Sequence, residues 1–186
     1  MNLAPTPLRD AWLIDLEPCN DTRGFFVRAY CEQEFCSHGF NTHWPQANHS
    51  YSALPGTLRG LHYQRASHQE IKLVRCLRGI VHDVIVDLRA ASHTRHQWFG
   101  VELKANRLRW LYVPQGFAHG FLTLTPDVEM EYMVSEPYAP EAEAGIRYND
   151  PYFDIRWPRA VELISPKDAS WPNFESATGD LVVGRK

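Results

Sequence analysis

The sequence predicts an all-β fold, either a β-sandwich, a jelly roll or a small barrel, and three observations support this prediction. Apolar and polar residues alternate in many short segments, as they do in half-buried strands. Turn-forming pairs such as Pro55-Gly56 and Pro126-Asp127 separate these segments at short intervals. Helical patterns are confined to Glu32–Cys36 and to the C-terminal part of the chain. Short strands divided by evenly spaced turns are typical of closed or stacked antiparallel sheets.

Strand patterns run through most of the chain. We expect strands at Ala11–Leu16, Gly24–Tyr30, Trp44–Ser52, Thr57–Gln64, Glu70–Leu77, Ile80–Arg89, Trp98–Leu103, Leu108–Val113, Gly120–Thr125 and Val128–Ser135. From Pro137 onward the chain is rich in Pro, Trp and Asp, which predicts a short helical or irregular segment wrapped over the barrel. A chain of 186 residues with no internal repeat predicts a single domain over residues 1–186.

Composition and charge argue against two classes of partner. The chain has 19 Lys and Arg residues against 22 Asp and Glu residues, so it lacks the broad basic face of a nucleic-acid-binding protein. No apolar run approaches the ~18 residues that a membrane span requires. The first residues do not resemble a secretory signal, and the four cysteines form no CxxC pair. We therefore expect a cytoplasmic protein with reduced thiols that binds neither nucleic acid nor membranes.

Ionisable side chains fall on strand faces that are otherwise apolar. Tyr132 shares a face with the apolar residues of Val128–Val134, because alternate residues of a strand point the same way. The same count places Lys72, Asp83 and Asp87 among inward-facing apolar residues. Buried charges are costly unless they are paired or used. An open barrel that binds a small polar ligand explains this pattern better than a packed core does; for the two aspartates we favour a structural or supporting role.

Two motifs carry candidate chemistry, RGLHYQ and VPQGFAHGF. The second contains P-x-G-x-x-H, ending at His119, which is the spacing of the second cupin motif. In the first motif His62 stands where a cupin has HxH, but Gln64 replaces the second histidine, and Lys72 stands where the glutamate ligand is expected. Two imidazoles beside an ammonium make a poor site for a divalent metal. The motifs predict a cupin-type jelly-roll barrel that holds no metal and performs acid–base chemistry.

Over most of its length the chain resembles the dTDP-4-dehydrorhamnose 3,5-epimerase family. The shared motifs occur in order from about Asp21 to Pro172, and they are RGFF (Arg23–Phe26), QANHS (Gln46–Ser50), GTLRGLHYQ (Gly56–Gln64), KLV (Lys72–Val74), DVIVDLR (Asp83–Arg89), VPQGFAHGF (Val113–Phe121), YNDP (Tyr148–Pro151), IRWP (Ile155–Pro158) and SPKD (Ser165–Asp168).

The resemblance implies epimerisation of a nucleotide-linked 4-keto-6-deoxyhexose at C3 and C5, without a cofactor. A ketone at C4 acidifies both C–H bonds because the resulting charge is held as an enolate. His62 fits the base, since a neutral imidazole accepts protons near pH 7, and the resemblance pairs it with Asp168, which would orient the ring. Lys72 fits the cation that stabilises the enolate. Tyr132 fits the acid that returns a proton from the opposite face.

The resemblance also implies a set of substrate contacts. Guanidinium groups suit phosphate oxygens, so Arg23 and Arg59 are expected to bind the diphosphate. Tyr138 matches the residue that stacks on the nucleobase. Gln46, Asn48 and Glu143 match substrate-contacting positions of the family, and His119 would lie against the sugar or Lys72. We also expect Arg28 and Lys167 to contact the substrate. Because the family pairs its N-terminal strands across a two-fold axis, we expect a homodimer in which Arg23 or Arg28 enters the partner's site.

The alternation of side chains along a strand requires an irregularity within the RGLHYQ motif. Arg59 and His62 are three positions apart, so a regular strand would turn them to opposite faces. Both can line one cavity only if the strand is bulged, and Gly60 is the natural position for the bulge.

Two departures from the family pattern leave alternatives open. Arg28 stands where the family has a glutamate near the nucleotide, so we expect weaker discrimination for thymine. The run His68-Gln69-Glu70 replaces an apolar lead into KLV. The alternatives are an epimerase acting on one carbon, a 3,4-ketoisomerase on a CDP- or GDP-sugar, a metal-dependent cupin dioxygenase and a sugar-binding cupin without catalysis.

Overall fold

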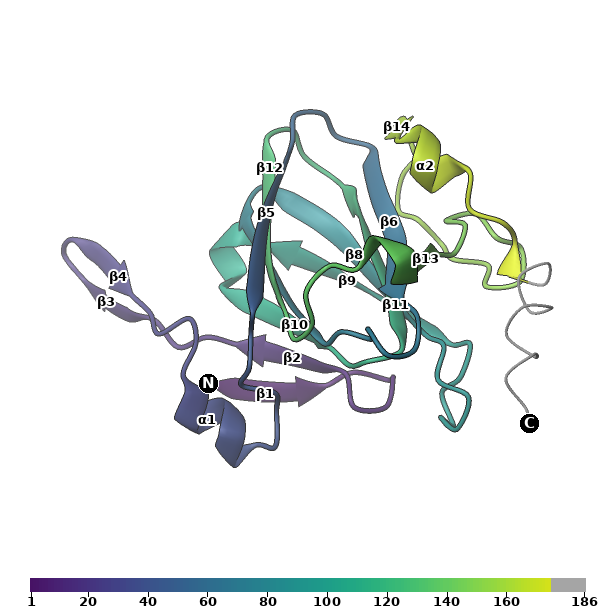
Figure 1. Ribbon diagram of the computed structural model, residues 1–186. Helices are drawn as coiled ribbons and strands as arrows, with labels where there is room; N and C mark the ends of the chain where they lie inside the picture. The colour runs from purple at the N-terminus through teal and green to yellow at the C-terminus, as the bar shows by residue number, and fades with distance from the viewer. Residues whose placement is uncertain (175–186) are drawn as a thin grey trace.

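Two β-sheets lie face to face and enclose an apolar interior in the computed structural model, which describes residues 1–174 (Figure 1). The first sheet has the order β1 (Asn2–Pro5), β2 (Trp12–Asp15), β10 (Arg109–Val113), β7 (Lys72–Arg78), β12 (Val128–Val134) and β5 (Gln46–Ser52). The second has the order β13 (Glu143–Gly145), β6 (Thr57–Gln64), β11 (Phe117–Thr123), β8 (Ile80–Asp87) and β9 (Trp98–Lys104), with β14 (Leu163–Ile164) paired to β6. The predicted all-β jelly-roll class is confirmed.

Helices are short and lie at the margins of the sandwich. They are α1 (Glu32–Ser37), α2 (Pro166–Ala169) and the 3-10 turns η1 (Ala105–Arg107) and η2 (Pro140–Ala142). No helix among residues 1–174 has the length and apolar character that crossing a membrane requires.

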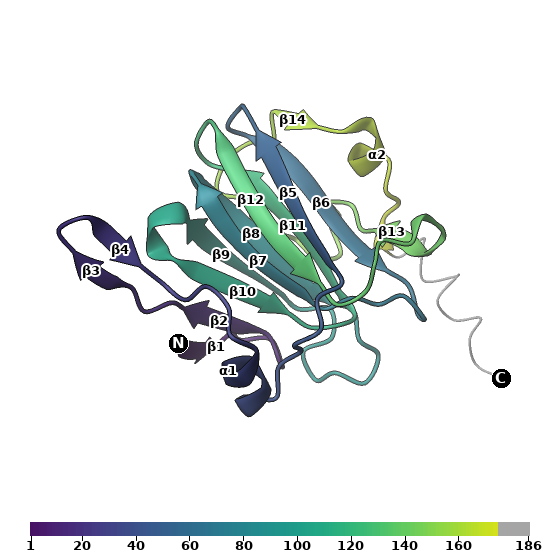
Figure 2. The ribbon, with the colours of Figure 1, turned by 60° about the vertical axis from the view of Figure 1, so that its left-hand side comes forward.

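A small hairpin projects away from the sandwich, as Figures 1 and 2 both show. It consists of β3 (Cys19–Asp21) and β4 (Gly24–Phe26), which pair only with each other. The predicted strand at Gly24–Tyr30 therefore stops four residues early, because β4 has no neighbour in either large sheet. Phe25 and Phe26 remain 58% and 75% exposed.

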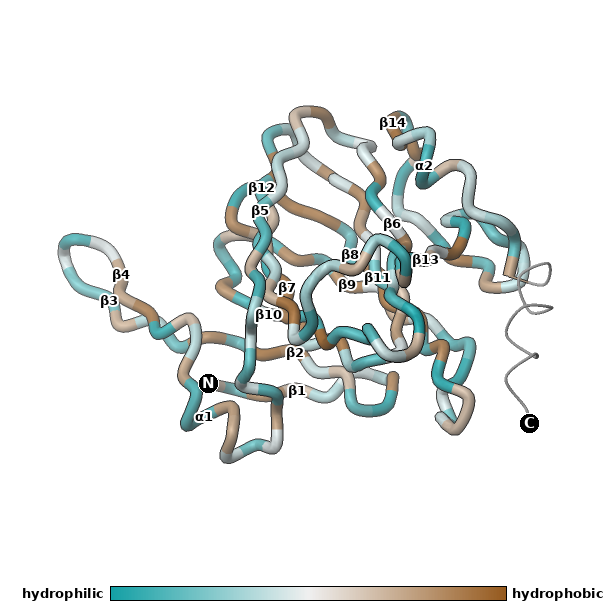
Figure 3. The backbone as a smooth tube through the Cα atoms, viewed as in Figure 1, coloured by the Kyte–Doolittle hydropathy of each residue, from teal (hydrophilic) through white to brown (hydrophobic). Residues whose placement is uncertain are grey.

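Within residues 1–174, three apolar clusters account for the packing. The first fills the space between the sheets and includes Val74, Ile85 and Phe117. The second lies between the outer face of β6, β8 and β11 and the C-terminal tail, where Val84 meets Phe153. Because β8 is covered on both faces, apolar residues occupy five of its eight positions and lie on both sides of the strand. Figure 3 shows the same concentration of apolar residues in the central strands. The third cluster seats α1 against the first sheet.

Candidate active site

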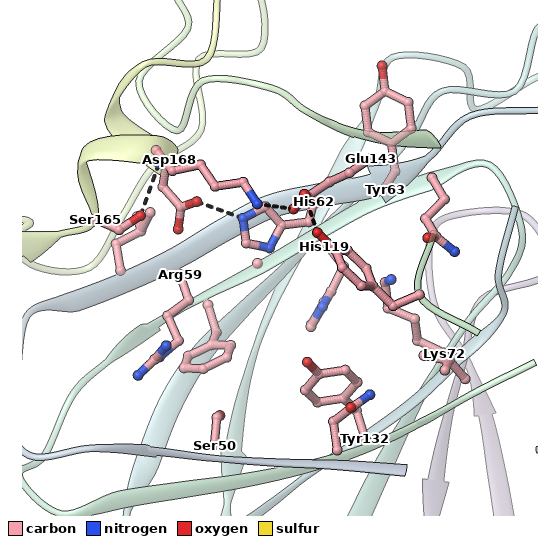
Figure 4. A pocket seen from close by; sticks show the side chains of 18 of the residues that line it. Ser50, Arg59, His62, Tyr63, Lys72, His119, Tyr132, Glu143, Ser165 and Asp168 are labelled. Carbon is pink, nitrogen blue, oxygen red and sulfur yellow. Dashed lines mark hydrogen bonds and ion pairs between the residues drawn. The ribbon is translucent and has the colours of Figure 1, made fainter. Parts of the chain in front are cut away.

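A cavity of about 800 Å³ opens between the two sheets, and the C-terminal tail closes part of its rim (Figure 4). Both sheets contribute side chains to it, as strand parity predicts for an open barrel. The cavity-lining residues that the sequence singled out are Gln46, Asn48, Arg59, His62, Lys72, His119, Tyr132, Tyr138, Glu143, Lys167 and Asp168.

Two histidines lie next to each other on one wall. His62 of β6 is the register partner of His119 of β11. The Nε2 atom of His62 lies 2.7 Å from Oδ1 of Asp168, and Nε2 of His119 lies 2.9 Å from Oδ1 of Asp83. Asp83 is fully buried beneath His119, so the supporting role that we favoured for it corresponds to a definite contact. Each imidazole thus faces a carboxylate through one nitrogen, which leaves Nδ1 as the nitrogen that can accept a proton.

A bulge in β6 brings Arg59 to the same wall as His62. His62 pairs with His119 and Arg59 pairs with Phe121, so three steps on β6 oppose two on β11. Gly60 has φ +122°, and a Cβ atom there would lie 2.5 Å from the Cα atom of Gly120. Only glycine fits at this position, and the bulge predicted at Gly60 is confirmed.

The C-terminal tail delivers Asp168 to this bulge. Ser165 caps α2 by accepting a hydrogen bond from the backbone N–H of Asp168 at 3.0 Å. The Oδ2 atom of Asp168 accepts the backbone N–H of Gly60 at 3.1 Å, while Oδ1 faces His62. Burial alone would raise the pKa of the Asp168 carboxyl, but His62, Gly60 and Ser165 together hold that pKa below its usual value. Asp168 is therefore held as an anion against the imidazole.

The opposite wall carries Tyr132 and Lys72. Tyr132 of β12 is the register partner of Val74 on β7 and of Asn48 on β5. Two residues further along β12, Val134 faces the same side and pairs with Lys72 and Gln46. Figure 4 shows Tyr132 across the cavity from His62. Burial raises the pKa of Tyr132; Arg59 opposes the rise and Glu70 adds to it. A phenol with a raised pKa is a proton donor throughout the neutral range.

Polar groups near the cavity rim are already engaged with one another. Arg59 donates to the carbonyl oxygen of Tyr51 at 2.9 Å and is exposed to solvent. Gln46 donates to Asn48 at 2.9 Å and accepts from the backbone N–H of Tyr138 at 3.0 Å. These contacts tie β5 to the segment that follows β12.

Glu143 joins Tyr138 to Lys167 at the rim. It accepts a hydrogen bond from the Tyr138 hydroxyl at 2.7 Å and from the Lys167 ammonium at 2.5 Å. Burial would raise the pKa of Glu143, but Lys167 and Tyr138 lower it overall. The ring of Tyr138 stays 54% exposed, as a stacking platform requires.

Arg23 and Arg28 do not reach the cavity of their own chain. Arg23 lies in the projecting hairpin and pairs with Asp21 at 2.5 Å. Arg28 pairs with Glu34 of α1 at 2.9 Å. Neither belongs to the cavity wall of its own chain, so a contact with substrate would have to be made in the partner's cavity.

Sequence reasoning did not identify three residues of this region as site residues. Glu70 lines the cavity and binds the ammonium of Lys72. Trp171 packs edge-on against His62, with ring centroids 6.5 Å apart. Gly145 is the register partner of His62, and a Cβ atom on it would overlap the indole of Trp171. The unusual acidic lead into KLV was a signal for Glu70, whereas no sequence pattern pointed to the other two.

Within residues 1–174, no group of three or more His, Cys, Asp or Glu side chains is arranged to hold a metal ion.

Comparison with known proteins identifies the group to which the chain belongs. The family model described as dTDP-4-dehydrorhamnose 3,5-epimerase matches residues 5–176. The enzyme of that name from Escherichia coli is 41% identical over 171 residues, which are 90% of this chain and 91% of the relative. The chain belongs to the dTDP-4-dehydrorhamnose 3,5-epimerase family.

Solved structures of similar proteins agree with this membership. Legionella pneumophila dTDP-6-deoxy-D-glucose-3,5-epimerase in complex with dTDP-4-keto-L-rhamnose has a TM-score of 0.86 and 38% identity, covering 91% of this chain and 90% of that one. The 3'-monoepimerase ChmJ from Streptomyces bikiniensis in complex with dTDP-quinovose has a TM-score of 0.89 and 31% identity, covering 96% and 90%. The family fold therefore serves both the inversion of two carbons and the inversion of one.

Proposed function

We propose that the protein is a nucleotide-sugar 3,5-epimerase that converts dTDP-4-dehydro-6-deoxyglucose to dTDP-4-dehydrorhamnose by proton transfer through an enolate. The observation that carries this proposal is the arrangement of base and acid: His62 and Tyr132 face each other from opposite walls of one cavity. Inversion of a carbon requires a proton to leave on one face and return on the other. The activities of the E. coli and Legionella relatives support the substrate class.

Proton removal is assigned to His62. Asp168 accepts the hydrogen bond from Nε2, so Nδ1 is free to take the proton from C3 or C5. The anionic carboxylate then stabilises the imidazolium that forms. General-base catalysis of this kind contributes roughly 10²–10⁴ in rate.

Lys72 and His119 are assigned to the ketone side of the sugar. The ammonium of Lys72 would meet the developing enolate oxygen, a contact worth on the order of 10²–10³ in rate. Lys72 and His119 are each only 8% exposed as whole residues, so the charge acts where water screens it little. Tyr132 then protonates the carbon from the far side, and its raised pKa keeps it in the acid form.

Binding of the nucleotide is assigned to the rim. Arg59 would bind the diphosphate as a guanidinium fork, and Tyr138 would stack on the base. Gln46, Asn48, Glu143 and Lys167 line the path between these two contacts.

We further propose a homodimer in the cytoplasm. The hairpin β3–β4 exposes Phe25 and Phe26 far from its own sandwich, and an apolar surface of this kind calls for a covering partner. A second copy would bury these rings and carry Arg23, and with it Arg28, toward the partner's cavity.

The proposed location in the cytoplasm agrees with the state of the cysteines. All four cysteines are free thiols, as expected in a reducing compartment.

The test of the proposed function is solvent-deuterium incorporation into dTDP-4-dehydro-6-deoxyglucose. We expect deuterium at both C3 and C5, with inversion at both. Deuterium confined to C3 would instead identify a one-carbon epimerase of the ChmJ type, and the absence of exchange would reject the epimerase reaction.

The dimer is tested by light scattering at micromolar concentration, on the wild-type protein and on Phe26→Ser. A fully active monomer would contradict the dimer.

A further inference from the structure

Two opposite charges lie together in the cavity wall, and only one of them has a role in the proposed reaction. Lys72 begins β7, and Glu70 lies two residues before it, so both side chains point to the same side of the chain. The Lys72 ammonium donates a hydrogen bond to Oε1 of Glu70. The side chains of Glu70 and Lys72 are only 5% and 10% exposed.

The second carboxylate oxygen of Glu70 makes this pair unusual. Oε2 is buried, and no residue in the described part of the chain donates a hydrogen bond to it. Burying an ion pair costs free energy that the attraction often fails to return, and apolar replacements of such pairs are frequently neutral or stabilising. An incompletely satisfied carboxylate adds to that cost. Stability of the fold therefore explains Glu70 poorly.

We propose that Glu70 is a positioning residue of the site, which fixes the ammonium of Lys72 and places one negative charge beside Lys72 and Tyr132. The effect of Glu70 on catalysis rests on the proposed epimerase reaction, whereas the contact between Glu70 and Lys72 does not depend on it. A lysine ammonium on four flexible carbons meets a ketone oxygen reproducibly only if another group holds it. Oε1 of Glu70 supplies that hold.

Glu70 also acts on Tyr132 through its charge. Register places Tyr132 one inward row from Lys72, so the three groups share one wall. The other charged and titratable groups that line the cavity are Arg59, His62 and Tyr63 on β6, His119 on β11, Glu136, Tyr138 and Glu143 after β12, and Lys167 and Asp168 on α2. Glu70 raises the pKa of Tyr132 in addition to the effect of burial, while Arg59 lowers it. The carboxylate thus helps to keep the phenol protonated for its task as an acid.

The first experiment compares Glu70→Ala and Glu70→Gln with wild type in the deuterium-exchange assay. Glu70→Ala frees the ammonium, so we expect kcat for exchange to fall roughly 10- to 100-fold with KM changed less than two-fold, because the ammonium acts mainly on the enolate. Glu70→Gln keeps an oxygen that accepts from Lys72 and should lose less. Glu141→Gln removes an exposed carboxylate outside the cavity wall and should exchange at the wild-type rate.

The second experiment needs no substrate, so it separates this inference from the proposed function. Tyrosinate absorbance is titrated in wild type and in Glu70→Gln, each against the matching variant that also carries Tyr132→Phe, so that the difference reports Tyr132 alone. We expect the pKa of Tyr132 to be lower in Glu70→Gln than in wild type, because the carboxylate that raises it is gone, and to be unchanged in Glu141→Gln.

Two results would overturn the proposal. One is a Tyr132 titration that Glu70→Gln leaves unmoved, and the other is a folded Glu70→Ala protein that exchanges within two-fold of wild type. Should wild type itself show no exchange, the epimerase assignment fails, and the tyrosinate titration still decides the role of Glu70.

Discussion

The Nε2 atom of His62 lies 2.7 Å from Oδ1 of Asp168, although 106 positions separate the two residues in the chain. The same carboxylate receives the N–H of Gly60, the residue at which β6 is bulged. One side chain of the tail therefore satisfies the irregular backbone and orients the base. The bulge that turns His62 into the cavity and the orientation of the His62 ring therefore depend on the same carboxylate, that of Asp168.

Replacing either member of this pair is expected to stop proton removal. His62→Asn should lower deuterium exchange at both carbons by roughly 10²–10⁴. Asp168→Asn should also be strongly impaired, because the amide NH2 can donate to Nε2 and select the wrong tautomer, and a neutral amide does not stabilise the imidazolium. The affinity for dTDP, measured by calorimetry, should stay within a few-fold of wild type. Exchange near the wild-type rate in His62→Asn would remove this residue from the mechanism.

Tyr132→Phe is expected to separate exchange from inversion. His62 still removes the proton, but the acid on the opposite wall is lost. Exchange of the substrate C–H bonds with solvent should therefore continue although inversion has slowed. Because the pKa of Tyr132 lies above its usual value of about 10, inversion by the wild-type enzyme should show no alkaline loss at pH 8–9. NMR of the product at C5 measures both effects. If the variant inverts C5 as fast as wild type, another group is the acid.

Gly145→Ala is expected to displace Trp171 and, through it, to disturb the orientation of His62. A methyl group at this position overlaps the indole of Trp171, which packs edge-on against His62. Trp171 lies in the same tail segment as Asp168, so its displacement should loosen the His62–Asp168 contact. Exchange should fall by up to roughly 10²-fold, the loss that a misplacement of about 1 Å can cause. Trp171→Phe presents a smaller ring and should restore much of the rate in the double variant. Full activity of Gly145→Ala alone would show that Trp171 does not position His62.

The nucleotide preference is expected to depend on Arg28 through the dimer. In its own chain Arg28 is held by Glu34, outside the cavity. If the partner's hairpin reaches the cavity, Arg28→Glu should increase the preference for dTDP over UDP, CDP and GDP, because a carboxylate accepts hydrogen bonds that a guanidinium cannot. Calorimetry with the four diphosphates measures this, with Glu34→Gln, which breaks the ion pair but keeps the Arg28 guanidinium, as the control. An unchanged preference would place Arg28 outside the base site.

Asp87 is expected to contribute to stability rather than to catalysis. It is fully buried and accepts hydrogen bonds from Arg89, Ser92 and Thr94. Burial opposes ionisation, but these donors lower the pKa of Asp87 to about 2. A lowered carboxyl pKa stabilises the fold above the unfolded pKa of about 4, and this contribution is lost as the pH falls from about 4 to about 2.

The free energy of unfolding of Asp87→Asn should therefore be about 2 kcal/mol lower than that of wild type at pH 7. The difference from wild type should shrink below pH 3, and chemical denaturation at several pH values measures it. A constant difference across this range would show that the Asp87 charge is not involved.

Local pattern was enough to predict most strands of the two large sheets and the inward side of Lys72 and Tyr132. Thr57–Gln64 is a strand with the predicted bounds, and Lys72 and Tyr132 face the cavity as their parity requires. Gly60 was identified as the bulge because two residues three positions apart had to share a wall. These features depend on the alternation of neighbouring residues, which is a property of the chain itself.

Contacts between distant segments were decided only by the tertiary structure. Asp83 became the partner of His119, and Glu70 the partner of Lys72, when strand register and burial brought them together. Likewise β4 ended at Phe26 because no strand of either sheet lies beside it. Alternation tells which way a side chain points, but not what lies opposite. The opposing group depends on the pairing of strands and on the path of the tail, which are set by the packing of the whole chain.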